Sequence, residues 1–126
     1  MPVELECGAP PEVVTLTGTA RAETRDNVTA VQAAHDNMEK GIREKIGKLH
    51  ADYHCKPPCE GNPAIRKLSG PKIVVGTDGW ETRTVWLKSS YGTHRDWNFE
   101  ETYQVYVFSL TWTVTAEISC IPRSGG

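Results

Sequence analysis

Residues 26–54 read DNVTAVQAAHDNMEKGIREKIGKLHADYH, and this stretch decides the fold. At 100° per residue its apolar side chains fall within one stripe about 120° wide, the width of a core-facing helical surface. We therefore expect one helix over residues 26–54, roughly 40 Å long at about 1.5 Å per residue. Asp26 and Thr24 are both suited to cap its N-terminus. The stripe consists of Val28, Val31, His35, Met38, Ile42, Ile46, Leu49 and Tyr53.

A second face of this helix carries small side chains, namely Ala30, Ala33, Asn37, Gly41 and Ala51. Such a face permits close approach of another backbone, within the chain or across a subunit boundary. The alternative is that alanine is present only as a good helix former, beside two costly glycines.

Strand patterns flank the helix. Residues 12–23 alternate with period two and are rich in β-branched side chains, which predicts a half-buried strand. Its small residues Gly18, Ala20 and Ala22 share one face, which predicts a bulky group packed over them. Residues 72–88 and 99–121 predict two more strands with a turn over 89–98. Asp78-Gly79 predicts either a hairpin turn or a bulge in one long bent strand.

These elements predict an α+β fold in the order β-α-β-β, with one long amphipathic helix on an antiparallel sheet of three strands, or four. The 126 residues form a single domain. Residues 1–11 are expected to be an extended lead-in, and the Pro/Gly-rich residues 55–71 a loop. If the last strand lies between the other two, it is antiparallel to both. The strand at 99–121 is longer than usual, so it should protrude and offer an edge to a partner.

Four cysteines allow three disulfide connectivities, with free thiols or a metal site as alternatives. The expected sheet register places Cys7 opposite Cys120, so we predict a Cys7–Cys120 bond and a Cys55–Cys59 bond. The even count favours an oxidising compartment, and therefore a secreted or periplasmic protein over a cytoplasmic one.

The charge balance argues against two classes of partner. The chain has 14 basic and 16 acidic residues, and the basic residues are not clustered. We therefore expect no nucleic acid partner. We also expect no membrane partner, because no apolar run approaches the roughly 18 residues needed to cross a bilayer.

The element order over residues 12–120, a long helix cradled by a β-α-β-β sheet, resembles the dodecin-like group of small oligomeric proteins. The resemblance implies a homo-oligomer assembled through the long strands, and a small planar ligand bound between aromatic side chains. The Pro-rich loop and the cysteines depart from the compact dodecin pattern, which affects the implied ligand function most.

Three sets of residues are candidates for a site. His50 and His54 share a helical face, and with Cys55 and Cys59 they would complete a tetrahedral zinc set. His35 and His94 are candidates for a general base. Aromatic side chains on the hairpin, with one arginine, could form a stacking surface for a flat ligand. This set consists of Trp80, Trp86, Tyr103, Tyr106, Trp112 and Arg83.

No catalytic motif is present in the sequence. We therefore expect a non-enzymatic, oligomeric binding or structural module with an aromatic-lined surface on its long hairpin and no cofactor. The alternatives are a small enzyme with a histidine base and a zinc-binding protein.

Overall fold

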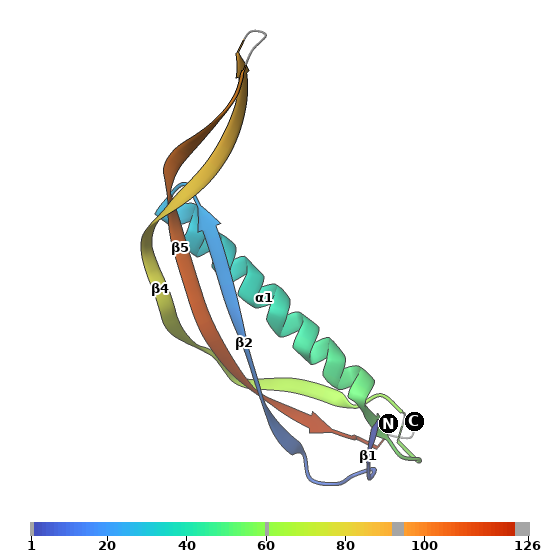
Figure 1. Cartoon of the computed structure of the whole chain (residues 1–126). Helices are drawn as coiled ribbons and strands as arrows, with labels where there is room; N and C mark the ends of the chain where they lie inside the picture. The colour runs from blue at the N-terminus through green and yellow to red at the C-terminus, as the bar shows by residue number, and fades with distance from the viewer. Residues whose placement is uncertain (1, 60, 92–94, 123–126) are drawn as a thin grey trace.

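The computed structural model contains one helix that lies along one face of a twisted antiparallel sheet (Figure 1). The structure describes residues 2–59, 61–91 and 95–122, and of residues 87–91 and 95–99 the backbone alone. The α+β class and the β-α-β-β order are confirmed. In chain order the elements are β1 (Val3–Leu5), β2 (Glu12–Thr24), α1 (Asn27–Asp52), β3 (Tyr53–Cys55), β4 (Ala64–Tyr91) and β5 (Arg95–Ser119).

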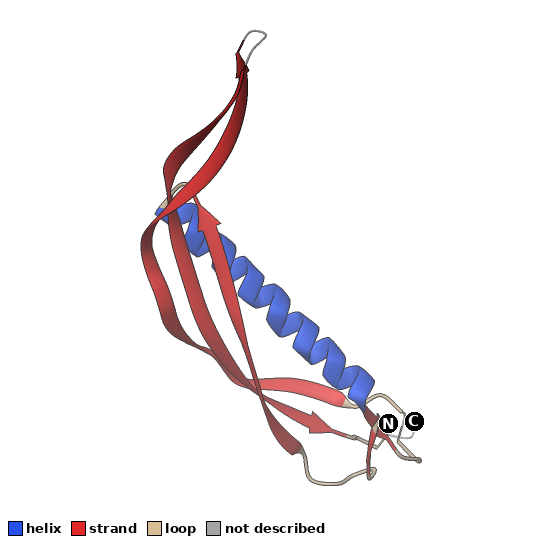
Figure 2. Cartoon of the chain, viewed as in Figure 1, coloured by secondary structure: helices blue, strands red, loops and turns tan. Residues whose placement is uncertain are grey.

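The main sheet has the strand order β2-β5-β4 (Figure 2), so the last strand does lie between the other two, and it is antiparallel to both. The register places Trp112 of β5 between Gly18 of β2 and Ile73 of β4. Helix α1 packs on β2 and β5 and scarcely touches β4. Therefore one edge strand of the sheet, β4, lies largely outside the helix–sheet core.

Helix α1 begins directly after its N-cap residue, Asp26. The Asp26 carboxylate accepts hydrogen bonds from the backbone N–H of Thr29 at 2.8 Å and from its hydroxyl at 2.7 Å. The helix ends at Asp52, because Tyr53 is extended and starts β3, which pairs in parallel with β1. The prediction that residues 53 and 54 are helical is therefore wrong. In the described part of the chain, no helix has the length and apolarity needed to cross a bilayer.

Compared with the predicted stripe, the buried face of α1 is rotated about the helix axis toward the small residues. The buried helical side chains are Ala30, Ala34, Met38, Ile42 and Leu49. Val28, predicted to be in the core, is 73% exposed. The small side chains let the helix lie close to β2, while β5 fills the remaining space with Phe108, Leu110 and Trp112.

Two irregular segments differ from expectation. β4 begins at Ala64, so the loop predicted over residues 55–71 is wrong in its second half. Register shifts on either side of Ser69 leave Leu68, and then Gly70 and Pro71, out of the pairing, which an edge strand tolerates because its outer backbone groups need no partner. β4 also continues through Asp78-Gly79 without a turn, as one long bent strand. The nearest register shift lies between Val75 and Thr77. At the hairpin, the strands extend into the segment predicted as a turn.

Both predicted disulfides are wrong: the bonds are Cys7–Cys59 and Cys55–Cys120. The short parallel pair β1–β3 explains the difference. It aligns Leu5 with Cys55. Because the pair is parallel, Cys7, which follows Leu5, lies beyond Cys55 on the side of Cys59, to which it is bonded. The backbone N–H of Lys56 donates to the Leu5 carbonyl at 2.9 Å and continues this alignment. The described ends of the chain lie at one end of the molecule, and the C-terminal end of β4 and the N-terminal end of β5 lie at the other (Figure 1).

Candidate functional site

The hairpin formed by β4 and β5 projects beyond the rest of the molecule (Figure 1). β2 ends at Thr24, which pairs with Tyr106. Beyond this point, residues 81–91 and 95–105 pair only with each other, and we call this two-stranded segment the arm. At about 3.3 Å per residue the arm spans roughly 30 Å. A two-stranded ribbon is only marginally stable in isolation.

The aromatic residues predicted as one ligand surface are divided among three environments. Trp112 is 1% exposed and belongs to the core beneath α1. Trp80 pairs with Tyr106 in the register, and with Trp86 they lie on the helix side of the sheet. Tyr103 and Arg83 pair with each other and lie on the opposite side. Of the predicted set, Trp80, Tyr106 and Trp86 therefore share the helix side of the hairpin beyond the core, where Trp112 is buried on the same side.

Trp80 and Tyr106 form the base of the arm on the helix side. Their rings meet edge to face, with centroids 5.2 Å apart. The Tyr106 hydroxyl donates a hydrogen bond to Asp78, and this bond raises the pKa of Tyr106. Trp80 and Trp86 remain 55% and 68% exposed.

On the opposite side, a group of ion pairs ties the arm to β2. Arg83 of β4 contacts Glu23 of β2 at 2.5 Å and Glu81 at 3.0 Å. Because β5 lies between β4 and β2, the Arg83 side chain crosses it, and Val105 and Val107 of β5 are buried there. Hydrogen bonds from Arg83, and then from Arg21, lower the pKa of Glu23.

Exposed apolar side chains concentrate on β4. Among the described residues, the exposed large hydrophobic side chains of this strand are Leu68, Ile73, Val74, Val75, Trp80 and Trp86. β1, β2 and α1 contribute one each. Because β4 is an edge strand, this strip borders a free row of backbone groups. The sequence predicts residues 73–75 only as part of a strand, and the signal that marks them is a run of three β-branched residues before a glycine.

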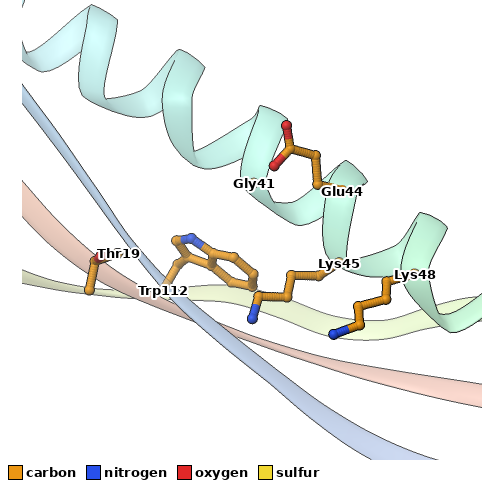
Figure 3. Close-up of a pocket in the computed structure, with 6 residues that line it drawn as sticks. All are labelled: Thr19, Gly41, Glu44, Lys45, Lys48 and Trp112. Atoms are coloured by element: carbon orange, nitrogen blue, oxygen red, sulfur yellow. The ribbon is translucent and has the colours of Figure 1, made fainter. Parts of the chain in front are cut away.

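A pocket of about 290 Å³ opens between α1 and β2 (Figure 3). It is lined by Thr19, Gly41, Glu44, Lys45, Lys48 and Trp112. Sequence reasoning missed this pocket, although a glycine in mid-helix was a visible signal. A second pocket of about 260 Å³ lies between α1 and β4, beside Met38, Ile42 and Pro71.

The structure does not assemble the predicted zinc set. Cys55 and Cys59 are each in a disulfide, so neither offers a thiolate. His50 and His54 are exposed, the latter with its ring beside Gly61. Within the described ranges, no group of three or more metal-ligating side chains comes together.

His35, the predicted base that lies in the described part of the chain, has no catalytic partner there. His35 is half-buried, stacks on Phe108 with ring centroids 5.9 Å apart, and has its Nδ1 2.8 Å from the Val31 carbonyl oxygen. No carboxylate of a described residue bonds to it. These contacts are those of a packed helix side chain. His94 lies outside the described residues.

Comparison with protein-family models, with curated proteins and with solved structures found no match to this chain.

Proposed function

We propose that the protein is a non-enzymatic homo-oligomeric binding module that assembles through β4. One observation carries this proposal: the exposed large hydrophobic side chains gather on this edge strand. An edge strand with apolar neighbours is the surface that adds a strand from another chain most readily. Assembly through the long strands is also what the resemblance to dodecin-like proteins implies.

A second copy fits this edge by symmetry. The straight part of β4 between its register shifts is residues 72–75. In an antiparallel two-fold pairing centred on Val74, Val74 faces Val74 of the second copy. Ile73 of each copy then faces Val75 of the other. Apolar groups therefore meet apolar groups across the axis, as an isologous contact requires. The result is one continuous six-stranded sheet in the order β2-β5-β4-β4-β5-β2.

The arm would present the binding surface of this assembly. Trp80 and Trp86 share the helix side, and a flat ligand or partner ring could stack on them. The two disulfides support an oxidising location, secreted or periplasmic.

The test makes the same substitution, valine to lysine, separately on each of the two edge strands of the sheet. Val74→Lys places a charge in the centre of the proposed contact, whereas Val13→Lys makes the same change on β2, the other edge strand. The two valines are matched, being 61% and 58% exposed. Light scattering at micromolar concentration should detect an oligomer for the native chain and for Val13→Lys, and a monomer for Val74→Lys. A monomeric native protein, or an oligomer that survives Val74→Lys, would refute the proposal.

A further inference from the structure

The pocket between α1 and β2 has a floor formed by one buried side chain. The indole of Trp112 lies between two glycines, Gly18 of β2 and Gly41 of α1. A Cβ at Gly41 would stand 3.6 Å from Cζ2 and 3.7 Å from Nε1 of Trp112. The nitrogen-bearing edge of the ring therefore faces the space beside Gly41, which is part of the pocket wall.

The indole N–H of Trp112 has no hydrogen-bond partner. Nε1 is a buried side-chain polar atom left unsatisfied in the described structure, on a residue that is 1% exposed. A buried donor without an acceptor has lost its hydrogen bond to water and has no other bond to offset that free-energy cost. Because Nε1 is buried between Gly18 and Gly41, the pocket wall must open slightly on the Gly41 side to admit an acceptor atom, which would then complete this bond.

Packing does not require a glycine at position 41. The contacts that an alanine Cβ would make with Trp112 are ordinary van der Waals contacts. Glycine is also among the weakest helix formers, so alanine would make the helix more stable. The missing methyl group keeps open the space next to the indole N–H.

The mouth of the pocket is positively charged. Lys45 and Lys48 are three residues apart and lie on the same side of α1. Neither takes part in the ion pairs found in the described part of the chain. Glu44 is the one acidic residue of the wall, so the lining carries a net positive charge.

We propose that this pocket binds a small carboxylic acid that carries a second oxygen acceptor at its far end. The carboxylate pairs with the ammonium groups of Lys45 and Lys48. The second oxygen accepts the indole N–H of Trp112, and the body of the ligand rests on the indole and on Gly41. The volume of about 290 Å³ suits a ligand of one ring, because it is at the lower limit for small-molecule sites.

The probe is 4-hydroxybenzoate, with benzoate as the analogue that lacks the second oxygen. In nitrogen–proton correlation spectra, 4-hydroxybenzoate should move the indole N–H signal of Trp112 downfield, with that signal assigned by Trp112→Phe. Benzoate should bind about tenfold more weakly, the worth of one hydrogen bond. A Trp112 signal that stays in place at millimolar 4-hydroxybenzoate overturns the proposal.

Two glycines of the same helix supply the matched variants. Gly41→Ala puts a methyl group into the pocket beside Nε1, whereas a Cβ at Gly47 meets nothing within 4 Å. Both changes should raise the Tm, because both remove a helical glycine. Only Gly41→Ala should abolish the shift of the Trp112 signal. Equal binding by the two variants would refute the site, whatever the oligomeric state of the protein.

Discussion

The indole of Trp112 fits its place because β2 offers no side chain opposite it. A Cβ at Gly18 would stand 2.5 Å from Cζ2 of Trp112, closer than two carbon atoms can approach. Gly18→Ala must therefore displace the ring or the strand, and overpacking of this kind costs about 1–3 kcal/mol. Gly79→Ala is the control, because a Cβ there meets nothing within 4 Å. Urea denaturation should show a lower free energy of unfolding for Gly18→Ala alone; equal stabilities would contradict this packing.

The burial of Trp112 could be predicted from the sequence alone. Period-two alternation puts it on the same face of its strand as Leu110 and Val114, and that face is buried. Its inclusion in a ligand surface rests on its place among the aromatic residues of the hairpin strands, not on the face of the strand that it occupies. The unsatisfied Nε1 could not be predicted, because it depends on how closely α1 approaches β2.

At the scale of elements, the ion pairs of Glu23 hold the base of the arm to β2. The pKa of Glu23 is lowered by Arg83 and Arg21, so its charged form is favoured in the folded state. The corresponding stability is present above the ordinary pKa of 4.5 and is lost as the pH falls through the lowered value. Thermal unfolding of the native chain and Glu23→Gln should differ near neutral pH, and the difference should vanish in acid.

Glu12→Gln is the control for this experiment. It makes the same change on β2, at a residue that takes part in none of the ion pairs of the described structure. A difference between the native chain and Glu23→Gln that persists unchanged at low pH would show that the carboxylate charge contributes nothing.

Long periodic elements were predictable, and short or irregular ones were not. The helix and the strands at β2 and β5 repeat their patterns over many residues, so single exceptions such as Val28 do not hide them. β1 and β3 have three residues each and show no period. The sequence predicts a break at Gly70-Pro71, because it does not show that β4 is an edge strand with bulges.

At the scale of the whole molecule, the disulfides join segments far apart in the sequence. Their separations are 52 and 65 residues, and the chain-entropy model assigns about 4 kcal/mol to a loop of either length. Removing one bond with the Cys55→Ala/Cys120→Ala pair should lower the free energy of unfolding by roughly 3–4 kcal/mol in urea. Partial reduction with alkylation and peptide mapping should recover Cys7 linked to Cys59. Recovery of Cys7 linked to Cys120 would contradict the structure.

The same two bonds determine how the protein carries mechanical load. Tension applied at the two ends enters at Cys7, crosses to Cys59, follows the backbone through Pro58, Pro57 and Lys56 to Cys55, and leaves through Cys120. This covalent route contains no part of α1 or of the β2-β5-β4 sheet. The helix, the sheet and the arm therefore lie outside the line of force, and of the regular elements only β1, which precedes Cys7, and Cys55 of β3 remain on it.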